Sequence, residues 1–186
     1  MKNIYSKISK LSIILFLVFT LVACTSKAPE GTQLSTGDSF PKFEGVDFKG
    51  NLINNEVFKD SPVTIMSIWF TGCKGCIDEM ETLQKISEEL KDKNVKVMSI
   101  CLDTYENKNI KEDAQKILKT KGVTYTNIAV KPSEESDAYL KNLTAFPTTL
   151  LIDRDGKVID NISLGSQEKV DELYKKIDEI IENENK

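Results

Sequence analysis

The stretch "WFTGCKGCIDEM", Trp69 to Met80, contains two cysteines separated by two residues, Cys73 and Cys76. It follows "VTIMSIW", residues 63–69, which is rich in β-branched residues and almost wholly apolar, as a strand buried on both faces must be. After the cysteines, apolar residues recur at helical spacing; they are Ile77, Met80, Leu83, Ile86 and Leu90. The pair therefore lies at a strand-to-helix junction, with Cys73 near the N-terminus of the helix.

The position of Cys73 favours its ionised form. Unpaired backbone N–H groups and the positive end of the helix dipole stabilise a thiolate there and lower the thiol pKa from about 8.5. Cys76, one turn further along, is close enough to form a disulfide with Cys73 and is expected to be more buried. Lys74 adds positive charge, and Gly75 leaves the approach open. We expect Cys73 to be the nucleophile and Cys76 the resolving thiol.

Glu79 stands three residues after Cys76 and hence on the same face of the predicted helix. A partly buried carboxylate at this position could exchange the proton that Cys76 must lose before it attacks. The alternative is a solvated surface acid, because Asp78 and Glu81 are close by and acids are common near helix N-termini. Both interpretations of Glu79 remain open from the sequence.

Strands and helices alternate along the folded part of the chain. "FEGVDFKGNLI" alternates around Gly50 and Asn51 as a hairpin does, and residues 95–102 predict a second buried strand. A helix should follow that strand, with one apolar face; its apolar residues are Ile110, Ala114, Ile117 and Leu118. "YTNIAV" and "SEESDAYLKNL" fit a strand at the edge of the sheet and a short helical insert.

The last third of the chain predicts a hairpin and a helix. "TTLLID" and "KVIDNI" flank the turn residues Asp153–Gly156. From Ser166 onward an apolar stripe faces away from acids and lysines, as in a helix that lies on a sheet; the stripe is Val170, Leu173, Ile177, Ile180 and Ile181.

Composition limits what the chain can do. Its 186 residues, 40% hydrophobic and 29% charged, suit one globular domain. The sequence contains no histidine, which excludes Ser-His-Asp triads, Cys-His pairs and imidazole metal sites. The net charge of −4 argues against nucleic-acid binding.

The N-terminal segment predicts export. Three lysines precede an apolar run from Leu11 to Ala23, which is short for a hydrocarbon core of about 30 Å but typical of a signal peptide, predicted as residues 1–23. The run ends in "LVAC", which resembles the bacterial lipobox, so Cys24 would be the lipidated N-terminus. Residues 24–36 then form a flexible tether and residues 37–186 the domain. An uncleaved membrane helix and a plain secretory signal are the alternatives.

"AFPT", residues 145–148, is the second informative stretch. A proline before the predicted strand removes a ladder donor, and on its own it suggests only a strand start. Together with the CxxC pair it resembles the thioredoxin superfamily. The resemblance implies a cis bond between Phe146 and Pro147, packed against the cysteines, with Phe146 offering its backbone to the substrate.

The resemblance narrows to the TlpA/ResA-like branch of membrane-anchored thiol-disulfide oxidoreductases, over nearly the whole chain from Gly37. The matching residues are Gly37, Phe40, Pro41, Phe43, Asp47, Gly50, Trp69, Cys73, Cys76, Glu79, Phe146, Pro147, Thr148 and "LIDRDGKVI". It implies a thioredoxin-like α/β fold: a central mixed sheet flanked by helices, an N-terminal hairpin, and a central helical insert near residues 109–121. It also implies that Trp69, Phe146 and Pro147 bind substrate.

The chain departs from the family pattern around the cysteines. Gly72 and Gly75 stand where an aromatic residue and a proline are usual, and a glycine pair widens the site. Ser67 stands where thioredoxin has an acid, which fits a proton-transfer role for Glu79. Glu81 occupies the place of a frequent helix proline, so the usual kink is not expected.

These observations predict an extracytoplasmic, lipid-anchored protein-disulfide reductase on the bacterial cell membrane. We expect a monomer without cofactor or metal that acts on disulfide-bearing exported proteins and receives electrons from a membrane donor. The alternatives are a disulfide oxidase, a purely structural disulfide, and a Cu(I) chaperone that uses Cys73, Cys76 and Cys101. Cys101 itself is predicted to be a buried free thiol.

Overall fold

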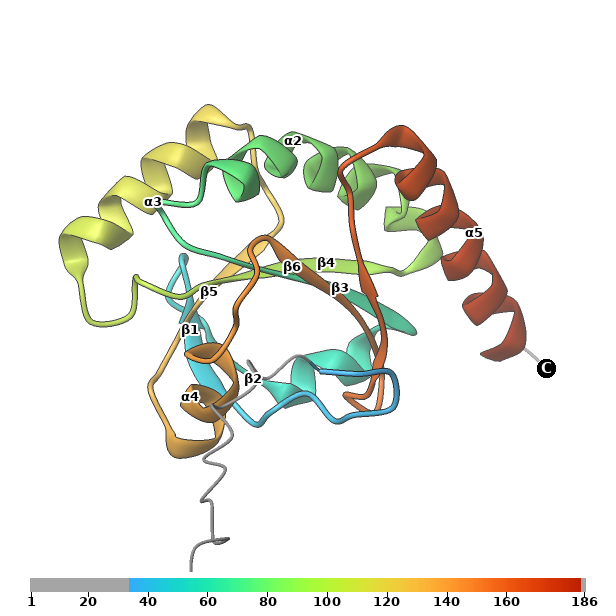
Figure 1. Ribbon diagram of the computed structural model, residues 1–186, viewed down its shortest axis with the longest axis horizontal. Helices are drawn as coiled ribbons and strands as arrows, with labels where there is room; N and C mark the ends of the chain where they lie inside the picture. Colours follow the sequence, from blue (N-terminus) through green and yellow to red (C-terminus); the bar gives the residue numbers. More distant parts are fainter. Residues whose placement is uncertain (1–33, 185–186) are drawn as a thin grey trace, which may run out of the picture. The chain divides into compact units, whose positions relative to one another are not determined.

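In the computed structural model, which describes residues 34–184, seven strands form one mixed sheet in the order β2-β1-β5-β4-β3-β6-β7 (Figure 1). Contacts group the described residues in one compact unit. The strands are β1 Glu44–Asp47, β2 Leu52–Asn54, β3 Val63–Trp69, β4 Lys96–Cys101, β5 Thr126–Val130, β6 Thr148–Asp153 and β7 Val158–Ile162. The predicted thioredoxin-like arrangement, with its N-terminal β1–β2 hairpin, is confirmed.

Strand β3 lies inside the sheet, as its apolar sequence predicts. Every residue of β3 is buried, and the strand runs parallel to β4 and antiparallel to β6. The register pairs Trp69 with Cys101, so β3 and β4 end side by side. The loops that follow these two strands therefore emerge together at one edge of the sheet.

The prediction of an edge strand at "YTNIAV" was wrong. Strand β5 lies between β4, to which it is parallel, and β1, to which it is antiparallel. The β1–β2 hairpin is what covers β5. The two backbones approach so closely at Gly45 that a Cβ there would lie 2.6 Å from the carbonyl oxygen of Ala129. Gly45 thus permits a pairing between segments far apart in the chain.

Within residues 34–184, four helices and two short 3-10 helices complete the fold. Three helices cover one face of the sheet and the fourth covers the other (Figure 1). The first group is α2 Lys74–Glu89, α3 Lys108–Thr120 and α5 Gln167–Glu184, and the other face carries α4 Glu134–Leu140; the 3-10 helices are η1 Asn55–Asp60 and η2 Lys91–Lys93. The predicted helices and the β6–β7 hairpin are confirmed, and α2 runs without a break past Glu81.

Alternation along β3 divides the core into two layers. Ile65 joins the cluster under α2 and α5, which includes Leu83 and Ile177. Its neighbour Met66 points to the opposite face and joins the cluster with Phe58 and Tyr139. A third cluster, beneath the N-terminus of α2, contains both site cysteines, and it couples the site to the core.

Three sequence predictions fall wholly or partly on residues 1–33. The signal peptide, Cys24 and residues 24–33 of the tether lie outside the described residues, and all three stay predictions. Within residues 34–184, none of the helices combines the length and the apolar character needed to span a membrane.

Candidate active site

The cysteine pair sits where β3 passes into α2. The chain turns over residues 70–73, closed by a hydrogen bond of 3.0 Å from the Cys73 amide to the carbonyl of Phe70. Cys73 is the N-cap of α2, as predicted. It forms a disulfide with Cys76, with an S–S distance of 1.97 Å and Cα atoms 5.3 Å apart. The N–H of Cys76 also donates to Cys73 Sγ at 3.2 Å, so a backbone donor is already aimed at the sulfur that would carry negative charge after reduction.

The two cysteines are both buried, and their exposed fractions follow the expected order. Cys73 is 7% exposed and Cys76 is 3% exposed. Lys74 is exposed, but its ammonium group is paired with Asp78, and this pairing lowers the pKa of Asp78. The negative charge of Asp78 therefore compensates much of the positive charge that Lys74 was expected to add near Cys73. Stabilisation of a Cys73 thiolate rests mainly on the N–H groups of α2.

Pro147 faces the pair from the start of β6. The Phe146–Pro147 peptide bond is cis, as the family resemblance implies. A Cβ built on Gly75 would lie 3.7 Å from Pro147 Cδ, which places the proline directly over the CxxC turn. The ring of Phe146 packs edge-to-face on Phe70, with ring centroids 5.2 Å apart. Two aromatic rings thus border the disulfide.

Glu79 lies on α2, one turn after Cys76, and is partly buried. Burial raises the pKa of its carboxyl group. A carboxyl whose proton affinity is increased is better suited to exchange a proton with a thiol than a solvated one. The proton-transfer role itself stays a prediction.

Trp69 does not form part of a substrate surface, contrary to the expectation from the resemblance. It is 1% exposed and belongs to the core cluster under the cysteines. Its indole N–H donates to Asn127 Oδ1 at 3.3 Å, and that oxygen also accepts from the Ser99 hydroxyl. Trp69 ends a strand buried on both faces, and its side chain packs in the core against the cluster that contains the two cysteines.

Asp103 is a residue of the site that sequence reasoning missed. Its carboxylate accepts hydrogen bonds from the backbone N–H of Thr71 at 3.1 Å and from the Thr71 hydroxyl at 2.6 Å. The Cys101 thiol donates to the same carboxylate at 3.3 Å. Asp103 thereby ties the turn before Cys73 to the end of β4. The sequence does contain a signal for Asp103: it follows a predicted buried strand, as Thr71 does, and polar residues that follow adjacent parallel strands meet at one edge of the sheet.

Cys101 is a buried free thiol, as predicted. Burial, followed by the charge and hydrogen bond of Asp103, strongly raises its pKa. The thiolate is the form that binds metals, so this direction weighs against Cys101 as a third copper ligand. Among the residues that the structure describes, no group of three or more cysteine, aspartate or glutamate side chains is arranged to hold a metal ion.

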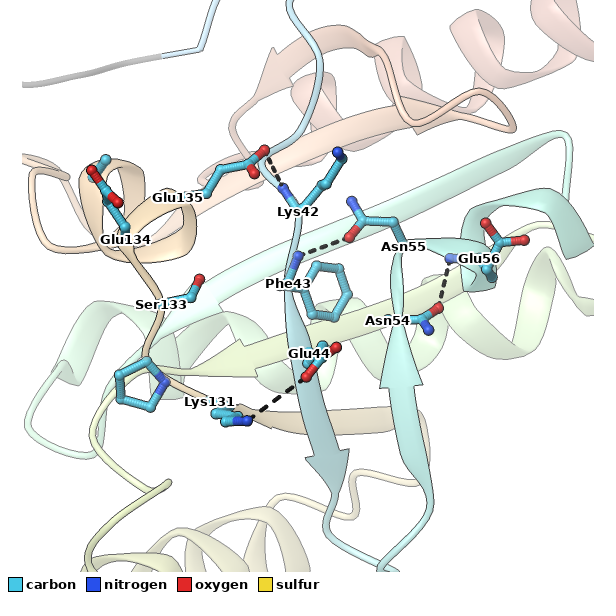
Figure 2. Close-up of a pocket in the computed structure, with 12 residues that line it drawn as sticks. Lys42, Phe43, Glu44, Asn54, Asn55, Glu56, Lys131, Ser133, Glu134 and Glu135 are labelled. Carbon is cyan, nitrogen blue, oxygen red and sulfur yellow. Dashed lines mark hydrogen bonds and ion pairs between the residues drawn. The ribbon is translucent and has the colours of Figure 1, made fainter.

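Two surface hollows are candidate binding sites. The larger, about 1020 Å³, lies between β1, β2 and the segment before α4 (Figure 2). Figure 2 shows that some of its polar groups contact one another: Glu135 accepts from the Lys42 amide, and Lys131 pairs with Glu44. It contains none of the predicted site residues. A second hollow, about 480 Å³, is lined in part by Phe70 and Phe146 and so adjoins the disulfide.

Comparison with known proteins agrees with this geometry. The model of the AhpC/TSA family matches residues 36–161. A thiol-disulfide oxidoreductase ResA of Bacillus thuringiensis subsp. konkukian is 29% identical over 78% of this chain and 80% of its own length. The thioredoxin-like protein YneN of Bacillus subtilis is 27% identical over 82% and 84% of the two chains.

Solved structures show the same fold. The thioredoxin domain of a thiol-disulfide oxidoreductase from Bacteroides vulgatus superposes with a TM-score of 0.64 at 25% identity, over 78% of this chain and 99% of that domain. A thiol:disulfide interchange protein from a Bacteroides species gives 0.63 at 24% identity, over 80% and 91% of the two chains.

Proposed function

Because the chain belongs to the AhpC/TSA family, we propose that it is a thiol-disulfide oxidoreductase that reduces disulfides in exported proteins from a lipid-anchored position outside the cytoplasmic membrane. The activity is supported by the named relatives and, above all, by one observation: the Cys73–Cys76 disulfide begins a helix and faces a cis-proline. A structural disulfide would close too small a loop to add much stability through chain entropy.

The reduced pair would act in two steps. The Cys73 thiolate attacks one sulfur of the substrate disulfide, forming a mixed disulfide and releasing the other sulfur as a thiolate, which takes up a proton. Cys76 then loses its proton and attacks Cys73 Sγ, which releases the second substrate thiol. Two electrons pass from the protein to the substrate, and the Cys73–Cys76 disulfide remains. The two substrate thiolates take up one proton from solvent and the equivalent of the one that Cys76 loses. A membrane electron donor must reduce it before the next cycle.

Glu79 is proposed to accept the proton that Cys76 loses in the second step. Its partial burial and the raised pKa of its carboxyl group support this role. Pro147 and Phe146 are proposed to hold the substrate backbone beside Cys73, because Pro147 lies over Gly75 of the CxxC turn and Phe146 packs on the cluster that contains both cysteines.

The anchored, extracytoplasmic location rests on the N-terminal sequence. The short apolar run after three lysines and the "LVAC" end support export followed by lipidation of Cys24. The test is labelling with a palmitate analogue in a bacterial host, in which the wild type should incorporate label into the membrane fraction. Cys24→Ala should not, and label retained by this variant would refute the proposal.

The activity is tested by two measurements on the protein with reduced cysteines. Equilibration against a thiol buffer gives the reduction potential: a value below about −250 mV supports a reductase, and one near −120 mV an oxidase. Cys76→Ser should accumulate mixed disulfides with its substrates, whereas Cys73→Ser should form none. A wild type that reduces neither insulin nor glutathione disulfide would overturn the proposal, and tight retention of copper in that protein would favour the chaperone instead.

A further inference from the structure

The hollow next to the disulfide is bordered by residues from three separate segments. We call it the aromatic groove and define it by Phe70, Leu102, Tyr105, Leu143 and Phe146, with Asp103 and Glu106 at its acidic side. Its volume of about 480 Å³ falls within the range of small-ligand pockets and accommodates one or two large side chains. The loop after β4 forms one wall, and the segment around α4 forms the other.

The aromatic groove adjoins the active site through two of its lining residues, Phe70 and Phe146. Phe70 lies three residues before Cys73, and Phe146 directly precedes Pro147. Both rings pack on the cluster that contains the two cysteines, and they contact each other edge-to-face. A peptide that places a cysteine at Cys73 therefore has the groove within reach of residues a few positions away in an extended chain.

The rim of the groove presents an apolar ring to solvent. Tyr105 is 39% exposed, and it is one of only two large hydrophobic side chains that are exposed among the described residues; the other is Leu52, on the distant edge strand β2. Tyrosine is enriched at protein interfaces, because its ring supplies apolar contact area while its hydroxyl group stays solvated.

Charge defines the second property of the groove. Three carboxylates line it, but Asp137 is paired with Lys141 at 2.6 Å, so those two charges compensate each other. The Asp103 carboxylate accepts hydrogen bonds from the neutral amide and hydroxyl groups of Thr71. With Glu106, it gives the groove a net negative potential that attracts a cationic side chain.

We propose that the aromatic groove selects substrates: it takes up an aromatic or large aliphatic side chain close in sequence to the reacting cysteine, while a neighbouring lysine or arginine of the substrate faces Asp103 and Glu106. The inference rests on the proposed function and specifies its substrate class. Selection is expected in the first step, since the segment must bind while Cys73 attacks.

The test uses three synthetic peptides that are identical except at two positions. Each carries one cysteine as a mixed disulfide with thionitrobenzoate, and the flanking residues are Phe with Lys, Ala with Lys, or Phe with Glu. The Cys73 thiolate attacks the peptide sulfur and releases the coloured thionitrobenzoate, the more acidic leaving group. Cys76 then displaces the peptide thiol, so one protein dithiol is oxidised for each disulfide reduced. The rate of colour release is measured in single turnovers.

The wild type should react about tenfold faster with the Phe-Lys peptide than with the Ala-Lys peptide, as expected for partial burial of one aromatic side chain. It should react about threefold faster with Phe-Lys than with Phe-Glu at low salt, and this second ratio should shrink as salt is added. Each ratio is taken on one protein, so changes in basal reactivity cancel.

Two variants locate the effect. Tyr105→Ser should lower the Phe-to-Ala ratio several-fold, and Glu106→Lys should remove or reverse the preference for Lys over Glu. Leu52→Ser and Glu179→Lys are the matched controls, because they change an exposed apolar residue and an exposed acid away from the groove, and they should preserve both ratios.

Three equal peptide rates in a wild type that still reduces glutathione disulfide would overturn the groove and leave the proposed function intact. Ratios that the groove variants leave unchanged would also overturn it. Loss of exchange with every disulfide, including glutathione disulfide, would instead contradict the proposed function.

Discussion

Asp103 should be a positioning residue for the turn that presents Cys73, and its removal should destabilise the fold measurably. Its carboxylate accepts two hydrogen bonds from Thr71, of 3.1 and 2.6 Å, and one from the Cys101 thiol at 3.3 Å. Hydrogen bonds to a charged group contribute about 1.5–3 kcal/mol each when buried. Here both Asp103 and Thr71 are partly exposed, so water replaces part of what is lost, and the thiol is a weak donor.

We therefore expect Asp103→Ala to lower the free energy of unfolding by about 2–3 kcal/mol. Asp103→Asn retains one acceptor oxygen without the charge and should lose only about 1 kcal/mol. The measurement is urea unfolding of the oxidised protein, followed by fluorescence of the buried Trp69. Asp113→Ala is the control, because this acid sits on the exposed face of α3 and its surface pair with Lys116 is worth less than about 0.5 kcal/mol.

A double-mutant cycle with Thr71→Val separates this contact from general loss of structure. The valine removes the hydroxyl donor and keeps the shape, so the coupling energy with Asp103→Ala should be about 1 kcal/mol. The same variants should shift the equilibrium of the Cys73–Cys76 pair with glutathione, because the turn before Cys73 is less restrained. Unfolding of Asp103→Ala within about 0.5 kcal/mol of the wild type, with zero coupling, would refute the reasoning.

Three further predictions concern the support of the site. Burial raises the pKa of Glu79 above its ordinary value of 4.5, so the native state keeps a proton that the unfolded chain releases, and stability falls as pH rises from that value through the native pKa. Glu79→Gln should consequently unfold at a higher urea concentration than the wild type at neutral pH, and at the same urea concentration below pH 4.5. In the same variant, the attack of Cys76 on the mixed disulfide should be slower. Asn127→Ala leaves the indole N–H of Trp69 without its acceptor and should lower the free energy of unfolding by about 2–4 kcal/mol in urea titrations; a loss below about 1 kcal/mol would contradict it. Gly45→Ala, whose Cβ would meet the Ala129 carbonyl, should lose at least about 1–3 kcal/mol, and unchanged thermal unfolding would show that the two strands can separate freely.

Local patterns were enough to predict the elements that surround the cysteines. The apolar run of β3 and the helical spacing from Ile77 to Leu90 are properties of single segments, and both elements form where they were expected. The neighbours of β5 could not be predicted in this way. Its partner β1 lies some eighty residues earlier, and only the close approach at Gly45 reveals the pairing. The pattern of β5 describes its burial but not which strand covers it.

The site residues show the same contrast between what a single segment predicts and what contacts between segments decide. Cys73, Cys76 and their place at the start of α2 follow from spacing, and the cis bond at Pro147 followed from family resemblance. Asp103 was missed because its partner, Thr71, belongs to another strand-end loop. Trp69 was assigned to the substrate surface through the family resemblance, whereas it ends a strand buried on both faces and its indole N–H donates to the buried Asn127.

The surroundings of the two cysteines differ in a way that makes Cys73 react before Cys76. Cys73 receives a backbone N–H at the helix start, which favours its thiolate, while Cys76 lies deeper, one turn before a carboxyl group whose pKa burial has raised. A carboxylate on that face disfavours a second negative charge, so Cys76 should keep its proton while Cys73 attacks the substrate. Deprotonation of Cys76 becomes useful only when Cys73 is part of the mixed disulfide. We expect Glu79, one turn further along α2, to take that proton. Because Lys74 is paired with Asp78, this polarity depends on the backbone of α2 and persists at salt concentrations that screen surface charges.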